Sequence, residues 1–182
     1  MNSSQHVIEQ TKNWINRVVV GCNFCPFASK VMKQQAVHYR VEESDASEVC
    51  LEVLLDEILR LDNDQQIETS FLIMPNAVKQ FADYLTLVDV AEKLLRQKGY
   101  EGIYQLASFH PLYLFAGTDD QDAANFTNRS LYPMLHLLRE ESIEKALQNY
   151  QEPESIPERN IHFAREKGLV YMKMLRDACF SI

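Results

Sequence analysis

Glycine is scarce in this chain, and the few glycines are not arranged for nucleotide binding. Only five occur in 182 residues, and they form neither a G-x-G-x-x-G nor a G-x-x-x-x-G-K-[ST] pattern: Gly21, Gly99, Gly102, Gly117 and Gly168. Those patterns supply the backbone that cradles phosphates in Rossmann and P-loop proteins. The chain therefore lacks the sequence signature of both classes.

Runs of basic residues and long apolar runs are also missing. The chain has 18 Lys and Arg against 26 Asp and Glu, a net charge of −8. Binding to phosphate backbones needs clustered basic side chains, so we expect no nucleic-acid partner. No apolar stretch is long enough to cross a bilayer, and residues 1–4 do not resemble the start of a signal peptide. We therefore expect no membrane partner.

Cysteine is used sparingly. Four cysteines in a chain of this length do not form the pattern of a disulfide framework, which fits a reducing cytoplasm. The length favours one domain, residues 1–182, with a core of its own.

Hydrophobic periodicity predicts an α/β fold. Strands are expected at 37–42, 69–74 and 102–109, and helices at 4–20, 26–34, 45–61 and 77–97. Alternating strands and helices favour parallel strands joined by right-handed crossovers. A fourth, edge strand is expected at 113–116. The sequence thus predicts a small, mainly parallel sheet of three or four strands flanked by helices.

The C-terminal third is predicted to be helical. A polar loop at 117–130 precedes a helix at 132–150. A last helix is expected at 155–179, with a break near Gly168. A loop as long as 117–130 is usually functional or disordered.

The segment Cys22-Asn-Phe-Cys25-Pro26 is the first candidate for chemistry. Gly21 fits a left-handed C-terminal cap of the first helix, Cys25 fits an N-cap, and Pro26 fits the first helical position. Free amides and the helix dipole would then favour a Cys25 thiolate. Cys25 is a candidate nucleophile, metal ligand or redox thiol, and the alternative is a small buried side chain.

The Cys22–Cys25 spacing also matches a thioredoxin-like dithiol motif, which follows a strand. Here Val18, Val19 and Val20 continue a helical stripe that begins at Val7. This periodicity disfavours the dithiol hypothesis.

Two further regions carry candidate residues. His110 follows a predicted strand, where ligands bind in open α/β sheets, although a backbone hydrogen bond could also fix it there. In the predicted helix 132–150, His136, Arg139 and Glu140 share a side with apolar residues. His136 and Glu140 are four residues apart, the spacing of two ligands or of an acid/base pair. The alternative is a structural ion-pair network.

Three motifs resemble a known family. They are Phe24-Cys-Pro-Phe-Ala28, Gln105-Leu-Ala-Ser-Phe-His-Pro111, and Asn125-Phe-Thr-Asn-Arg-Ser130 leading into Leu135-His-Leu-Leu-Arg-Glu140. In this order they resemble the bacterial "domain of unknown function 1415" family over nearly the whole chain. The resemblance implies no activity. Its motifs fall on residues already selected: Cys25, His110, Arg129, His136, Arg139 and Glu140.

The leading hypothesis is a cytoplasmic enzyme, a hydrolase or transferase, that acts on a small anionic molecule. Its catalytic residues would be Cys25, His110, His136 and Glu140, and its substrate-binding residues Asn128, Arg129 and Arg139. A second hypothesis is a zinc or iron site formed by those four catalytic candidates. A third is a non-catalytic binding or assembly module. The sequence identifies no cofactor and no oligomeric state.

Overall fold

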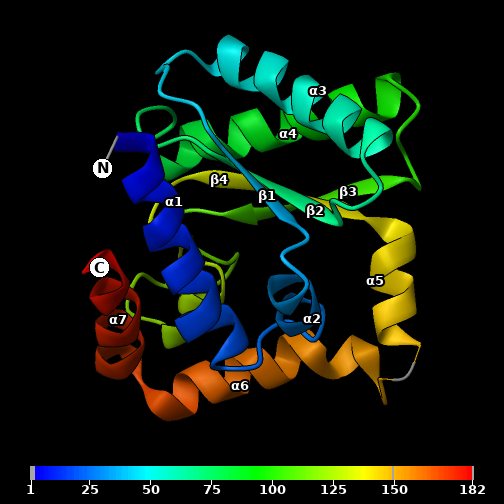
Figure 1. The fold of residues 1–182 in the computed structure, drawn as a ribbon. Helices are drawn as coiled ribbons and strands as arrows, with labels where there is room; N and C mark the ends of the chain where they lie inside the picture. The colour runs from blue at the N-terminus through cyan, green and yellow to red at the C-terminus, as the bar shows by residue number, and fades with distance from the viewer. Residues whose placement is uncertain (1–2, 149, 182) are drawn as a thin grey trace.

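A four-stranded mixed sheet forms the centre of the protein. The computed structural model describes residues 3–148 and 150–181. The strands lie in the order β1–β2–β4–β3, with bounds β1 Val37–Val41, β2 Thr69–Ile73, β3 Tyr104–Phe109 and β4 Met134–Arg139. β1 and β2 are parallel, whereas β4 runs antiparallel to both β2 and β3. The α/β class is confirmed, but the sheet is mixed rather than mainly parallel (Figure 1).

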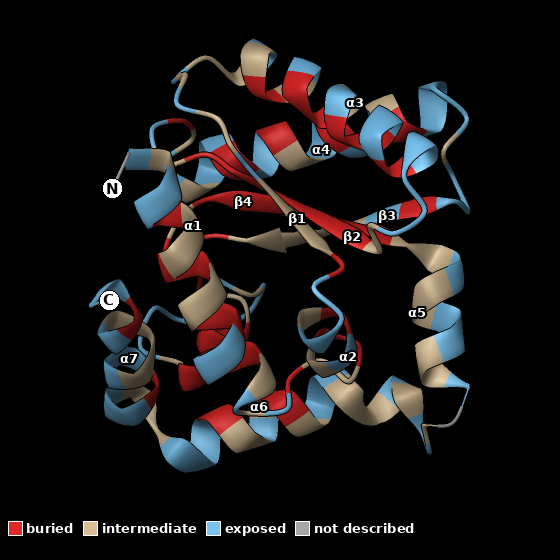
Figure 2. Cartoon of the chain, in the orientation of Figure 1, coloured by how far each residue is buried: buried red, intermediate tan, exposed pale blue. Residues whose placement is uncertain are grey.

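Helices cover both faces of this sheet. The crossover helices α3 (Ser47–Asn63) and α4 (Phe81–Gln97) pack on one face, against strand residues that include Leu72, Leu135 and Leu137. On the other face lie α1 (Ser3–Trp14) and α2 (Ala28–Lys33), with α6 (Ile156–Lys167) and α7 (Leu169–Asp177) beyond them (Figure 1). The sheet therefore separates two cores, and β2, buried along its whole length, lies between them (Figure 2). Among the described helices, none combines the length and apolar character that crossing a membrane requires.

The prediction of one helix over 132–150 is wrong. Residues Met134–Arg139 form β4, and α5 begins only at Glu140 and ends at Leu147. Residue 149, inside the expected helix, lies outside the described residues. A central strand is buried on both faces, so its short apolar run cannot be distinguished from a buried helix by periodicity. The apolar residues of 134–138 and 143–147 fall on opposite sides of a helical projection because they belong to two different elements.

The N-terminal helix ends in a π-helix. α1 continues into a π-helix, Ile15–Val20, so the expected helix over 4–20 is confirmed. Gly21 is not a left-handed cap, since its φ is −62°. It is required for another reason: a Cβ at this position would lie 2.3 Å from the carbonyl oxygen of Arg17. The left-handed residue is Asn23, with φ 54°, which turns the chain towards Cys25.

Two expectations for residues 113–130 need correction. Residues 113–116 are not a strand. Within the expected polar loop, Ala123–Thr127 form a buried 3-10 helix that packs against α6. The predicted break near Gly168 is confirmed, because Gly168, at φ 83°, separates α6 from α7.

Candidate functional site

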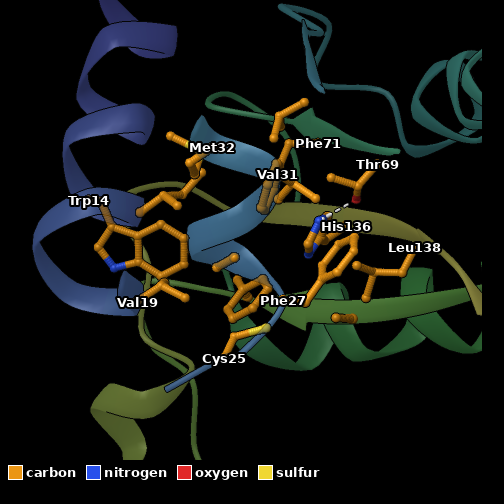
Figure 3. Close-up of a pocket in the computed structure, with 15 residues that line it drawn as sticks. Trp14, Val19, Cys25, Phe27, Val31, Met32, Thr69, Phe71, His136 and Leu138 are labelled. Carbon is orange, nitrogen blue, oxygen red and sulfur yellow. Dashed lines mark hydrogen bonds between the residues drawn. The ribbon is translucent and has the colours of Figure 1, made fainter. Parts of the chain in front are cut away.

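A small apolar cavity lies between the sheet and the helices α1 and α2. Its volume is about 100 Å³, and its wall combines side chains from every strand with the segment 14–32 (Figure 3). The polar members are Cys25, Thr69 and His136. The apolar ones are Trp14, Ile15, Val19, Phe27, Ala28, Val31, Met32, Val37, Phe71, Ala107, Phe109 and Leu138. A mainly apolar wall with a few polar groups is the usual lining of a small-molecule site.

Local structure brings Cys25 to this cavity. The π-helix adds a wide turn that leaves Trp14, Ile15 and Val19 on the cavity wall. π-helical turns are rare in proteins, but many of those that occur lie at functional sites. After Asn23 the chain passes through Cys25 and enters α2. The expected cap is displaced: α2 begins at Ala28, and Cys25 lies three residues before it.

The Cys25 thiol is neutral in its resting state. Burial raises the pKa of Cys25 above its ordinary value, and this outweighs hydrogen bonds from the backbone N–H groups of Phe27 and Ala28, which lower it. The amides expected near the sulfur are therefore present. The expected resting thiolate is not, because a charge in an apolar cavity loses more solvation than two amides replace.

His136 lies at the middle of β4 and faces the same cavity. Across the sheet it pairs with Phe71 of β2 and Ala107 of β3. Its ring stacks on Phe71 with centroids 3.7 Å apart and an interplanar angle of 8°. Burial lowers the pKa of His136 to about 3, so the imidazole is neutral at pH 7.

Thr69 determines which nitrogen of His136 carries the proton. The Thr69 hydroxyl donates to the carbonyl of Leu137, so its oxygen accepts from Nε2 of His136, 2.5 Å away. Nδ1 then carries a lone pair, since a neutral imidazole has one N–H. Among the described residues, Nδ1 has no hydrogen-bond partner, and no hydrogen bond joins Cys25 to His136. The cavity thus contains a neutral thiol and a neutral imidazole with one free acceptor.

His110 does not line this cavity, and both of its ring nitrogens are bound by the backbone. It is fully buried, its Nε2 donates to the carbonyl of Val78 at 3.0 Å, and its Nδ1 accepts from the backbone N–H of Leu112 at 3.0 Å. Burial lowers the pKa of His110, although the bond to Val78 acts in the opposite direction. Both ring nitrogens are occupied, so His110 fixes the loop that contains Val78, a residue strained at φ 44°.

The two arginines expected to hold an anion are bound by their own chain. Arg129 is buried and donates to the carbonyls of Tyr113 and Asp120 and, at 2.7 Å, to the Asp120 carboxylate. Arg139 donates to the hydroxyl of Tyr104 and to three carbonyls at the end of α3 and just after it: Leu61, Asp64 and Ile67. Neither guanidinium lines the cavity.

The remaining candidates are also dispersed. Glu140 begins α5 and lines a separate surface pocket with Glu92, Arg96 and Glu101, so the helical His136–Glu140 spacing does not exist. Asn128 donates to the carbonyl of Ser108 and lines a pocket next to the Cys25 cavity. Within residues 3–148 and 150–181, no three His, Cys, Asp or Glu side chains are arranged to hold a metal ion. Of the four catalytic candidates, the structure brings only Cys25 and His136 to one cavity.

The dithiol hypothesis gains no support. The segment before Cys22 is helical rather than a strand, and all four cysteines are free. Burial raises the pKa of Cys22 as well, although the charge of Lys167 acts against it.

A buried polar cluster on the other face of the sheet was not predicted. Glu57 of α3 is buried and accepts hydrogen bonds from His38 (2.6 Å), Ser70 (2.6 Å) and Arg60 (3.1 Å). Burial alone would raise its pKa and is the largest single effect, but these three partners together outweigh it and lower the pKa. A signal was present in the sequence, since Glu57 continues the apolar stripe of Cys50, Val53, Leu54 and Leu61.

Fold and site together define a mixed α/β protein with a small apolar cavity lined by one thiol and one imidazole. The chain belongs to the family described as "Protein of unknown function (DUF1415)", whose model matches residues 6–174. The resemblance of the three motifs to that family is therefore confirmed. Comparison with curated proteins and with solved structures gave no match.

Proposed function

We propose that this protein is a cysteine-dependent enzyme of the hydrolase or transferase type. Cys25 is the nucleophile, His136 is the proton acceptor, and the substrate is a small molecule whose buried part is apolar. The observation that carries the proposal is the shared cavity: two side chains from distant parts of the sequence line one small apolar space.

The protonation states indicate how such a pair would react. Thiol and imidazole are both neutral at rest, because burial opposes charge on each. An ion pair formed in advance would lose much solvation in an apolar cavity. The thiol proton therefore moves to the free Nδ1 of His136 as the sulfur attacks, which is general-base catalysis of a nucleophilic step.

The cavity supports an uncharged reacting group rather than the anionic substrate expected from the sequence. None of its lining residues is a lysine or an arginine. A carboxylate or phosphate placed there would be desolvated without a partner. Arg129 and Arg139, the candidates for such a partner, are engaged by backbone carbonyls elsewhere.

A second candidate function is non-catalytic binding of a small apolar molecule. The apolar lining and the size of the cavity favour it, since an engineered cavity of about 150 Å³ binds benzene. The two functions differ in one respect: binding alone gives His136 no influence on the reactivity of Cys25.

Alkylation kinetics separate the two candidates. The rate of carbamidomethylation of each cysteine by iodoacetamide is followed by peptide mass mapping, in the wild type and in His136→Gln. We expect Cys25 to react at least ten-fold more slowly in His136→Gln, with Cys22 unchanged. His162→Gln, at an exposed position of α6, is the matched control. An unchanged Cys25 rate in a folded His136→Gln protein would contradict the enzymatic proposal.

A further inference from the structure

Cys25 lies on the boundary between two cavities. A second pocket of about 250 Å³ adjoins the first, and both are lined by Val19, Cys25 and Phe109. We call the first the inner compartment and the second the outer compartment. The other residues that line the outer compartment are Phe24, Phe115, Thr127, Asn128, Ile156, Pro157, Asn160 and Ile161. His136 lines only the inner one.

The two compartments differ in polarity. The inner compartment lies between the sheet, α1 and α2, and its wall is almost wholly apolar. The outer compartment includes three uncharged polar side chains, Thr127, Asn128 and Asn160, and reaches the surface at Pro157, an exposed residue of α6. Neither set of lining residues contains an Asp, Glu, Lys or Arg.

A nucleophile between two compartments suits a substrate that is cleaved next to the attacked atom, because each compartment can then hold one of the two parts. One part is transferred to the sulfur and the other part leaves. Because no charged side chain is available on either side, phosphoryl and carboxylate groups are poor candidates for the reacting part. Esters and thioesters are uncharged electrophiles that a thiol attacks and splits into an acyl part and a leaving part.

Building on the proposed function, we infer that the substrate is an uncharged ester or thioester with a short acyl chain. The acyl group occupies the inner compartment and the leaving group occupies the outer one. The inner volume of about 100 Å³ is smaller than the cavity of about 150 Å³ that holds benzene, so it accepts acyl chains of roughly two to five carbons.

The reaction balances with water as the only co-reactant. The Cys25 sulfur bonds to the acyl carbon while its proton passes to Nδ1 of His136. The bond from the acyl carbon to the leaving oxygen or sulfur breaks, and His136 returns the proton to that atom. Water, deprotonated by His136, then attacks the acyl carbon of the acyl-cysteine thioester. The bond from the acyl carbon to sulfur breaks, the carboxylic acid is released, and His136 returns the proton to the sulfur, which regenerates the Cys25 thiol.

A series of p-nitrophenyl esters tests the inference on the full chain. Acetate, butyrate, hexanoate and decanoate are compared by p-nitrophenol release and by intact mass. We expect a covalent acyl adduct on Cys25 with acetate and butyrate, and at least a ten-fold slower reaction with decanoate. Cys25→Ser should lose the adduct, and Cys22→Ser should keep it.

A variant that enlarges the inner compartment should change the preferred acyl chain length, which is a result that misfolding cannot produce. Met32 is half-buried and lines only the inner compartment, so Met32→Ala should shift the preferred chain from butyrate towards hexanoate. Ile161→Trp, in the outer compartment, should slow the reaction with all esters without changing that preference.

Equal rates for all chain lengths in the wild type, or no shift in Met32→Ala, would overturn the two-compartment assignment. No acyl adduct from any ester, with Cys25 alkylation still dependent on His136, would overturn the ester class while the proposed function stands. If alkylation is also independent of His136, both proposals fail.

Discussion

The hydroxyl oxygen of Thr69 lies 2.5 Å from Nε2 of His136, and its own proton goes to the carbonyl of Leu137. This relationship between a β2 residue and a β4 residue fixes the histidine as the Nε2–H tautomer. It leaves Nδ1 as the only free ring nitrogen on the side chain that shares a cavity with Cys25. The role assigned to His136 therefore depends on a threonine outside the three sequence motifs.

Thr69→Val tests that dependence with a side chain of the same shape. We expect a stability loss of about 1–2 kcal/mol, because a buried imidazole N–H loses its acceptor. The specific readout is nitrogen NMR of His136, which should change from one tautomer to a mixture. A purely structural role for Thr69 would lower stability and leave the tautomer unchanged.

The buried imidazole should make stability depend on pH. The folded pKa of His136 is about 3, below the unfolded value of 6.5. The unfolded state therefore binds more protons between pH 3 and 6.5, and stability falls as the pH decreases through that window. The His136 contribution is up to about 5 kcal/mol. Denaturant titrations at several pH values should give a flatter profile for His136→Gln, and identical profiles would contradict the burial of a neutral imidazole.

His110 should matter for stability and not for Cys25. His110→Ala removes a buried ring that satisfies Val78 and Leu112, so we expect a loss of about 3 kcal/mol. The rate of Cys25 alkylation, measured under conditions where the variant is folded, should equal that of the wild type. His162→Ala, at an exposed site, should change stability by less than about 0.5 kcal/mol. A ten-fold change in Cys25 reactivity in His110→Ala would place His110 back among the catalytic candidates.

The buried carboxylate of Glu57 should stabilise the fold at pH values above the pKa that Glu57 has in the unfolded chain. Its folded pKa is lowered, so this stability is present above about pH 4.5 and is lost as the pH falls through the folded value. Glu57→Gln keeps the shape and removes the charge, and we expect a loss of about 1–3 kcal/mol at pH 7. Glu52→Gln, at an exposed position of the same helix, is the control. Equal denaturation midpoints for the two variants would contradict this account.

Sequence patterns predicted the amphipathic helices and the buried strand β2, but they missed the second central strand, β4. The helices ending near Gly21, Leu61 and Gly99 each bury one stripe, and their positions were predicted to within a few residues. β4 is buried on both faces, and its mainly apolar sequence has no strand period. That single misassignment produced the supposed His136–Glu140 pair.

The site was predicted only in part, for a similar reason. Cys25 and His136 were selected from local motifs, and both lie on the cavity. Their neighbours on the cavity wall, Trp14, Thr69 and Phe71, are ordinary core residues in sequence, and only the pairing of β2 with β4 brings Thr69 and Phe71 to His136. Arg129 and Arg139 resemble ligand-binding residues in sequence because backbone carbonyls, their actual partners, leave no mark on the side-chain pattern.

Carbamidomethylation of Cys25 in a Cys22→Ser background tests the central claim most directly. Trp14 is the only tryptophan in the chain and lines the same cavity as Cys25 and His136. Placing one small neutral group on the Cys25 sulfur should therefore change the fluorescence of Trp14 and shift the ring-nitrogen resonances of His136 together, in proportion to the modified fraction. Complete modification of Cys25 with both signals unchanged would show that the thiol and the imidazole do not share a cavity.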